Sequence, residues 1–395
     1  MPVSYAKKTI EDVSVEAKRV FVRVDFNVPF DSAGQILDDR RIREALPTMK
    51  NLIGRGARVI VASHLGRPGG KPNPAYSLRP VAARLSDLLG QSIGFIPDTV
   101  GSTAELAVNQ LKPGQVALLE NLRYFPGEEK NDPVFAEQLA RLADLYVNDA
   151  FGTAHRAHAS TVGITHFLPS VSGLLMQKEL RALGEALEAP RQPLVAVIGG
   201  AKISSKIGVL QNLLPRVSSL LIGGGMANTF LKARGLEVGC SLVENDRIDL
   251  AKQIMASAGS TLILPVDVVV ARKAAPDTPT KTVSVDQVPS DHMILDIGPR
   301  TAKRFREILQ AAGTVIWNGP LGLTEIAEFA EGTRATARAL ADLSAVSVVG
   351  GGDLVAALDQ LGVTDRLSHV STGGGASLEF LEGRVLPGVA ALQGR

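Results

Sequence analysis

The chain has 395 residues, of which 45% are hydrophobic and 21% charged. This length exceeds what one core normally supports, so we expect two domains, and the composition excludes disordered and fibrous proteins. The net charge of +2 is too small for a protein whose main partner is nucleic acid. The N-terminus lacks the apolar core of a signal peptide, and no apolar run suits a membrane. With Cys240 as its single cysteine, the chain cannot form an intrachain disulfide, which favours the cytoplasm.

Short β-branched runs alternate with segments of helical periodicity in the first half of the chain. The predicted strands lie at 20–26, 57–64, 116–120 and 145–149. Each is followed by a polar or glycine-containing turn and then by a helical segment. This βα alternation is typical of a parallel sheet with helical crossovers.

The second half repeats the alternation with six apolar runs, most of them ending in glycines. They lie at 194–200, 218–225, 261–271, 314–319, 345–353 and 367–375, and they predict a second doubly wound sheet. The predicted organisation is a first domain at 1–172, a linker helix at 173–190 closed by prolines, and a second domain at 191–379. Residues 380–395 carry turn signals but no phosphate motif, and one interpretation packs them back onto the first domain.

Three polar residues alternate along the first predicted strand. Arg23, Asp25 and Asn27 precede Pro29, so on a continuous strand all three point to one side of the sheet. A solvated face is the simpler interpretation. Because both faces of a parallel strand are usually covered, three polar side chains in register are costly unless they meet one another or a ligand. We therefore expect them to belong to a ligand site.

Further cationic groups follow the ends of the other predicted strands of the first half. They are His64, Arg67, Arg123 and Arg156, with Arg156 between two more histidines. Together with Arg41 they suit a small anion that carries a phosphate at each end, or a phosphate and a carboxylate. Ligands of open parallel sheets bind beyond these strand ends. His64 is also open to a purely structural interpretation as a hydrogen-bonding neighbour.

Glycine-rich turns follow the predicted strands of the second half. In GGAKISSKIG, Lys202 and Lys206 are four residues apart, which on a helix places both on one face near its positive end. In VVGGGDL, the glycines at 350–352 expose amides at a helix start, and Asp353 either ligates Mg²⁺ on nucleotide phosphates or caps the helix. Neither a P-loop nor a GxGxxG motif is present. Three such turns, with Glu325 after WNGPLG, favour a nucleotide.

Taken together, these segments resemble the phosphoglycerate kinase family. The strings that carry the resemblance occur in the family's order between residues 21 and 379: RVDFNVP, RRIREALPT, SHLGRP, ENLRYFPGEEK, GTAHRAHAST, GGAKISSKIG, LIGGGMANTF, LPVD, WNGP, GGGDLVAAL and STGGGASLE. The resemblance implies an α/β fold of two Rossmann-like, doubly wound parallel-sheet domains joined by a helical hinge, in a monomer. It implies a glycolytic kinase that transfers a phosphoryl group reversibly between 1,3-bisphosphoglycerate and ADP, giving 3-phosphoglycerate and ATP. Transfer would be direct and in line after domain closure, with Mg²⁺ carried by the nucleotide.

The resemblance also implies the residues of both sites. The acid would be bound by Asp25, Phe26, Asn27, Arg41, His64, Leu65, Gly66, Arg67, Arg123 and Arg156. The nucleotide would be bound by Lys202, Lys206, Glu325, Gly350, Gly351, Gly352, Asp353 and Leu354, with Asp353 holding Mg²⁺ and Glu325 binding the ribose. The catalytic set would be Arg41, Lys202, Lys206, Gly351 and Gly352. No nucleophile is required, because positioning and positive charge supply most of the catalysis.

Three positions depart from the family's usual pattern. Leu354 stands where the family has threonine, which removes a hydroxyl contact to phosphate. Asn228 replaces a common aromatic residue, and Ile294 replaces a glycine. All three bear on the nucleotide site and none on the acid site.

Two other classes of function compete with a kinase. A nicotinamide-dependent oxidoreductase would suit doubly wound sheets, but its GxGxxG turn is missing. A two-lobed binding protein without activity would not explain two lysines and a carboxylate suited to Mg²⁺ opposite the arginines. NADH binding tests the first alternative, and ATP formation tests the second.

Overall fold

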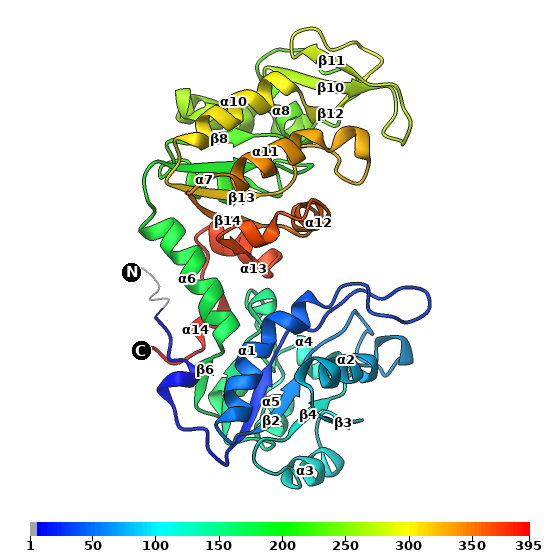
Figure 1. The fold of residues 1–395 in the computed structure, drawn as a ribbon, viewed down its shortest axis with the longest axis vertical. Coiled ribbons are helices and arrows are strands. Elements are labelled where there is room, and N and C mark those ends of the chain that lie inside the picture. The colour runs from blue at the N-terminus through cyan, green and yellow to red at the C-terminus, as the bar shows by residue number, and fades with distance from the viewer. Residues whose placement is uncertain (1–5) are drawn as a thin grey trace. The chain divides into compact units, whose positions relative to one another are not determined.

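The computed structural model describes residues 6–395, which divide into two compact units (Figure 1). The first unit runs to Arg181 and includes Val385–Arg395, and the second is Ala182–Arg384. The division falls inside helix α6 (Leu174–Glu188), which lies in the segment predicted as a linker helix. The domain limits expected at 172, 190 and 379 stay predictions, and residues 1–5, with which the first predicted domain begins, lie outside the described residues.

The first unit is built on a parallel six-stranded sheet in the order β3-β4-β2-β1-β5-β6. Its strands are β1 (Arg19–Arg23), β2 (Arg58–Ala62), β3 (Gly94–Ile96), β4 (Val116–Leu119), β5 (Leu145–Asn148) and β6 (Ser170–Ser172). Its helices are α1 (Arg40–Gly54), α2 (Arg79–Leu89), α3 (Ser102–Asn109), α4 (Pro126–Glu129), α5 (Pro133–Ala140) and α14 (Pro387–Ala390). Because later strands add on both sides of β1, the strand order reverses at its carboxyl end, where ligands of such sheets bind.

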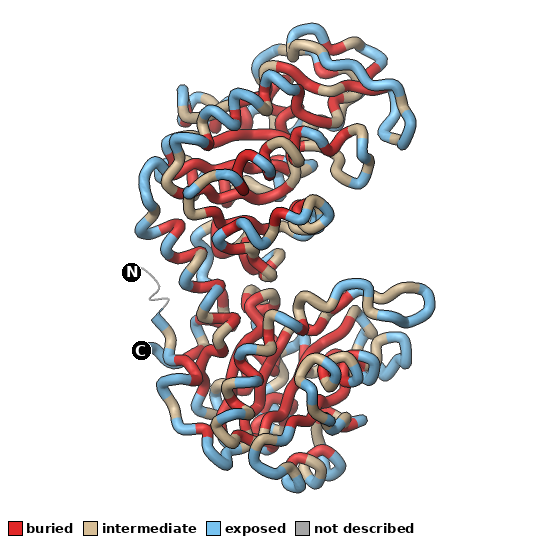
Figure 2. Tube along the Cα trace, viewed as in Figure 1, coloured by how far each residue is buried: buried red, intermediate tan, exposed pale blue. Residues whose placement is uncertain are grey.

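Both faces of this sheet are buried (Figure 2). On β1, Val20 and Val22 join a cluster of apolar side chains that includes Met49 of α1. Phe21 points to the opposite face, where its ring lies 6.1 Å from that of Tyr146. This alternation follows from the two-residue period of a strand and explains why the strands read as continuous apolar runs.

The second unit has its own parallel six-stranded sheet in the order β15-β14-β13-β7-β8-β9. The strands are β7 (Leu194–Ile198), β8 (Ser219–Ile222), β9 (Leu262–Ile263), β13 (Thr314–Asn318), β14 (Val346–Gly350) and β15 (His369–Val370). The helices are α7 (Ile207–Leu213), α8 (Gly225–Ala233), α9 (Ile248–Ala258), α10 (Pro299–Gln310), α11 (Glu331–Ala341), α12 (Gly352–Gln360) and α13 (Gly375–Leu381). Trp317 of β13 and Phe305 of α10 are fully buried in its core. The strand order reverses between β7 and β13.

A small antiparallel sheet of the second unit was not expected. It has the order β11-β10-β12, with β10 (Asp267–Ala271), β11 (Lys281–Ser284) and β12 (Met293–Ile297). The interpretation of 261–271 as one strand of the large sheet is therefore wrong. Pro265 lies between β9 and β10, and because proline cannot donate to a strand ladder, the run divides between two sheets there.

The last eleven residues belong to the first unit. Gly388 N–H donates to Ala154 O at 2.8 Å, and Arg395 N–H donates to Ala6 O at 3.0 Å. The C-terminal segment thus runs beside the first described residues of the chain. Within residues 6–395, no helix combines the length and the apolar character that crossing a bilayer requires.

Candidate active site

Polar side chains gather beyond the carboxyl ends of β1 and β2. Asp25 forms an ion pair with Arg41, whose Nη1 lies 2.6 Å from its Oδ2. The other oxygen of Asp25 lies 3.9 Å from His64 Nε2. Arg41 comes from the first turn of α1, and its side chain is 36% exposed. The structure thus brings together three residues that the resemblance assigns to the acid.

The loops after β2, β4 and β5 add further residues to this cluster. Asn27 Oδ1 accepts a hydrogen bond from Gly66 N–H at 2.8 Å, and Gly66 O accepts one from Arg123 Nη1 at 2.8 Å. Arg123 is only 4% exposed, and its Nη2 has no hydrogen-bond partner in the described chain. Arg156, which donates from Nε to His155 Nε2 at 3.1 Å, is close enough to act electrostatically on Arg123.

Three of the predicted acid ligands are placed differently from the rest. Arg67 is exposed and makes no hydrogen bond or ion pair with any residue between 6 and 395. Phe26 and Leu65 have buried side chains that belong to the apolar core. Any contact that these two make with a ligand must come from the backbone.

The prediction that Arg23, Asp25 and Asn27 share one strand face is wrong. Strand β1 ends at Arg23, and Asp25 and Asn27 lie in the loop that follows. The ladder stops because Phe26 N–H donates to the Ser63 hydroxyl, at 2.8 Å, instead of to the next strand. Arg23 itself is fully buried, so it lies behind the cluster and not in it.

Burial and positive charge set the ionisation of this cluster. Burial, and then the neighbouring guanidinium groups, hold the pKa of His64 well below its ordinary value. The same causes lower the pKa of His158 to about 3. Burial also lowers the pKa of Arg123, with Glu129 opposing the shift and Arg156 adding to it. At neutral pH the arginines therefore supply the charge, and the two histidines act as neutral hydrogen-bonding groups.

The second unit has a cavity of about 430 Å³ at the glycine turns that follow β7, β8 and β13. Its walls include Gly200, Gly224, Leu242, Met293, Leu323, Glu325 and Asp353. The turns pack backbone against backbone: a Cβ on Gly199 would lie 2.0 Å from Pro320 O. Only glycine allows so close an approach, which explains the glycines after β7. The cavity brings Glu325 and Asp353 to one place.

The two predicted lysines do not share a helix face. Helix α7 begins only at Ile207, so Lys202 lies in an exposed turn and Lys206 is the residue that precedes the helix. Lys206 Nζ donates to Asn318 Oδ1. Burial lowers the pKa of Lys206 to about 8, while Glu382 and Asp353 raise it. Lys206 is thus a partly buried cation near Asp353. Lys202 lies near Glu244: burial raises the pKa of Glu244, and the hydrogen bonds from Ser204 and, to a smaller extent, the charge of Lys202 lower it.

Helix α12 begins at the third glycine turn. Gly350 ends β14, and Gly351 precedes the helix with a φ of +106°, a value that favours glycine. Asp353 is exposed, and its carboxylate makes no hydrogen bond with the described residues, so the helix-cap interpretation is wrong. Leu354 is fully buried in the core with Trp317, so its side chain faces away from solvent.

Two of the three unusual positions line the cavity. Asn228 is 1% exposed, and its Nδ2 donates to Leu242 O at 3.3 Å. Ile294 is 8% exposed, and both residues belong to the cavity wall. Sequence reasoning missed Leu242 and Met293, which come from a loop and from the unexpected small sheet and carry no polar signal.

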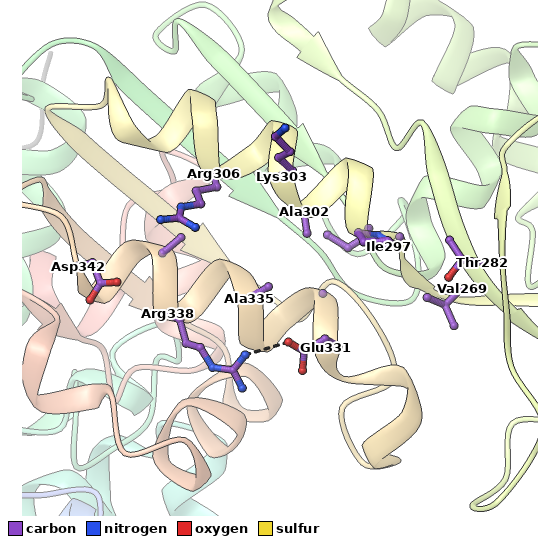
Figure 3. A pocket seen from close by; sticks show the side chains of 14 residues that line it. Val269, Thr282, Ile297, Ala302, Lys303, Arg306, Glu331, Ala335, Arg338 and Asp342 are labelled. Atoms are coloured by element: carbon purple, nitrogen blue, oxygen red, sulfur yellow. Dashed lines mark hydrogen bonds and ion pairs between the residues drawn. The ribbon is translucent and has the colours of Figure 1, made fainter.

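A second cavity of this unit, of about 670 Å³, contains none of the predicted site residues. It lies between α10 and α11, where Ala302 and Ala335 leave space between the helices (Figure 3). Glu331 and Arg338 form an ion pair of 2.9 Å at its edge.

A cluster of arginines on one parallel-sheet unit, and a glycine-lined cavity with carboxylates and a nearby lysine on another, are features of two-unit α/β kinases. The model of the family described as phosphoglycerate kinase matches residues 10–384. The chain is 58% identical to a phosphoglycerate kinase of Chloroflexus aurantiacus over 98% of this chain and 99% of that protein. It is 57% identical to one of Pelotomaculum thermopropionicum, with the same coverage.

A solved structure of phosphoglycerate kinase from Coxiella burnetii superposes with a TM-score of 0.89, at 45% identity and covering 98% of both chains. The chain therefore belongs to the phosphoglycerate kinase family, and its activity is that of a kinase of glycolysis. The predicted α/β fold, the resemblance and the enzyme class are confirmed.

Proposed function

We propose that this enzyme transfers a phosphoryl group directly between the carboxyl phosphate of 1,3-bisphosphoglycerate and ADP, giving 3-phosphoglycerate and ATP. The observation that carries the acid site is Arg123: a buried guanidinium that pairs with Glu129 through Nε at 3.2 Å and whose Nη2 has no hydrogen-bond partner among residues 6–395. Buried donors are normally satisfied, and a phosphate or carboxylate oxygen would satisfy this one.

The proposed acid ligands have two kinds of role: some supply positive charge, and others hold the charged groups in place. Arg41 and Arg123 carry the positive charge that attracts the acid's anionic groups, with Arg156 beside them. Asp25 holds Arg41, and Asn27 holds Gly66, so these two act mainly by fixing the cations and the loop. Arg41 is a partly exposed cation, which suits a role at the group being transferred.

The nucleotide would occupy the cavity of the second unit. Its apolar wall of Leu242, Met293 and Leu323 suits a base, and Glu325 is the carboxylate suited to a ribose hydroxyl. Asp353 fits Mg²⁺ carried by the nucleotide phosphates. Its carboxylate lines the cavity and makes no hydrogen bond with residues 6–395, so its oxygens are available to a metal ion. When bound, Mg²⁺ neutralises phosphate charge. Lys206 would bind phosphate and the group in transfer.

The transfer itself requires no covalent intermediate on the protein. Its transition state spreads negative charge over equatorial oxygens, and fixed cations stabilise that charge.

Because the acid and nucleotide sites belong to different units, we propose that closure of the units precedes transfer. Small-angle scattering should then give a smaller radius of gyration with both ligands bound than with neither; an unchanged radius with intact activity would refute closure. We propose that the enzyme acts as a monomer in the cytoplasm.

The proposal is tested by ATP formation from 1,3-bisphosphoglycerate and ADP in a coupled assay. We expect turnover by the wild type and a large rise in KM for the acid in Arg123→Gln, which keeps a polar side chain but not the charge. Arg216→Gln in the second unit is the matched control, because Arg216 is an exposed arginine whose side chain, among the described residues, bonds to Asn212 of the preceding helix. No ATP formation by the wild type would refute the proposed reaction, and an unchanged KM in Arg123→Gln would refute the acid site.

A further inference from the structure

A set of buried polar side chains lies behind the proposed acid site, with His158 Nδ1 beside it at 3.8 Å from Glu128 Oε1. Arg23, Glu128 and Ser160 are all fully buried. The Ser160 hydroxyl lies 2.5 Å from Glu128 Oε1 and 2.8 Å from Arg23 Nε. Ser160 N–H donates to Glu128 Oε2 at 3.0 Å, and Arg23 Nη2 lies 4.0 Å from Glu128 Oε1. None of these residues is assigned to the acid or the nucleotide.

With Glu128 ionised, the donors and acceptors of this set can be arranged in only one way; burial raises the pKa of Glu128, and the charge of Arg23 and the hydrogen bonds from Ser160 oppose that shift. A guanidinium group can only donate, so the Ser160 oxygen accepts from Arg23, and the hydroxyl proton must go to Glu128. Glu128 then accepts with both oxygens, which a carboxylate does and a carboxamide cannot do. Arg23 Nη1 donates to Val24 O, which leaves Nη2 free for a partner on the other side.

That partner is His64, whose Nδ1 lies 3.2 Å from Arg23 Nη2. Since Arg23 cannot accept, Nδ1 must be the acceptor. His64 is buried among arginines and neutral, so its single ring proton has to lie on Nε2. Nε2 is the nitrogen that faces Asp25 and the cluster of acid ligands.

We propose that Glu128, Ser160 and Arg23 are positioning residues that hold neutral His64 in the tautomer with its proton on Nε2. The acid site then offers an N–H donor to an anionic oxygen. In the opposite tautomer it would offer a lone pair, which repels such an oxygen. Tyr146, whose hydroxyl donates to Ser160 O at 2.7 Å, fixes the backbone of the set. The inference rests on the proposed acid site.

The tautomer is measured by long-range ¹H–¹⁵N correlation on the full-length, ¹⁵N-labelled protein at pH 7, with the His64 signal identified by its loss in His64→Asn. We expect a protonated Nε2 and an unprotonated Nδ1 in the wild type, and a mixture of tautomers in Ser160→Ala. Ser160→Ala keeps the charges of Arg23 and Glu128, so it is the variant expected to fold; Glu128→Gln is the second. Ser170→Ala, another buried serine of this unit, whose hydroxyl donates to Leu168 O at 2.8 Å, is the matched control and should leave the His64 tautomer unchanged.

Kinetics then tests the use of this tautomer. Ser160→Ala should raise KM for 3-phosphoglycerate about tenfold, the weight of one hydrogen bond, with kcat changed by less than about threefold. A protonated Nδ1 in the wild type, or a His64 signal identical in wild type and Ser160→Ala, would refute the positioning of His64 by these residues even if the enzyme forms ATP. A changed tautomer with an unchanged KM would refute its role in acid binding. Failure of the wild type to form ATP would overturn the proposed reaction. The NMR result would then test the positioning of His64 by itself.

Discussion

The lowered pKa of Lys206 predicts how strongly the activity depends on pH. Burial lowers the pKa of Lys206 to about 8, against the raising effect of Glu382 and Asp353. Its proton is therefore lost within the pH range in which the enzyme can be assayed. Raising the pH removes a positive charge that the phosphates require, so activity must fall and not rise. One unit above the pKa about a tenth of the amine stays charged, so kcat/KM for Mg-ADP should fall about tenfold between pH 7 and pH 9.

Two variants separate Lys206 from other titrating groups. Lys206→Arg keeps its charge throughout, so its kcat/KM should stay flat over this range, whatever its absolute level. Asp353→Asn removes a carboxylate that raises the pKa of Lys206, so its decline should begin at lower pH. Since kcat/KM reports the free enzyme, bound phosphates should move the corresponding decline in kcat to higher pH. A wild-type kcat/KM that is constant to pH 10, or an equal decline in Lys206→Arg, would contradict the reasoning.

Two further substitutions test the catalytic cation and the metal ligand. Arg41→Ala should lower kcat by two to three orders of magnitude, or about 3 kcal/mol, because it removes a charge that stabilises the transition state. The control is Arg43→Ala, on the same helix and paired with Asp39 at 2.7 Å, whose kcat should stay within a few-fold of wild type. Equal losses of kcat in the two variants would exclude the role given to Arg41. Asp353→Ala should raise the Mg²⁺ concentration needed for half-maximal activity and lower kcat, and a Mg²⁺ titration that matches wild type would rule out Asp353 as a metal ligand.

The convergence of the proposed acid ligands was largely predictable because strand ends can be read from sequence. The carboxyl ends of neighbouring parallel strands meet at one edge, so polar residues after separate strands were expected to converge, and Asp25, His64 and Arg123 do so. The position of Arg23 was not predictable in this way. A two-residue period carries information only while the ladder continues, and the Ser63 hydroxyl that ends it comes from a different strand.

The nucleotide cavity was less predictable, because its walls depend on tertiary packing. The glycine turns were visible, since their backbones approach too closely for any side chain. The start of α7 was misplaced because Lys202 and Lys206 fit a helical period equally well inside or before a helix. Leu242 and Met293 are apolar residues in segments without periodicity, and nothing distinguishes them from core residues until the small sheet is seen.

Leu354 shows how structure changes the meaning of a departure from a family pattern. From sequence, its importance is the hydroxyl that it lacks; in the structure, it is a fully buried core residue beside Trp317. Leu354→Thr removes apolar volume and buries a hydroxyl, so it should destabilise the protein by about 2 to 4 kcal/mol. KM for the nucleotide should change by less than about tenfold, the weight of one modest hydrogen bond. Leu354→Val, which loses volume without gaining a hydroxyl, is the control. Its unfolding temperature should lie between that of wild type and that of Leu354→Thr. A Leu354→Thr variant as stable as wild type that binds nucleotide more than tenfold tighter would show that this side chain reaches the phosphates and is not held in the core.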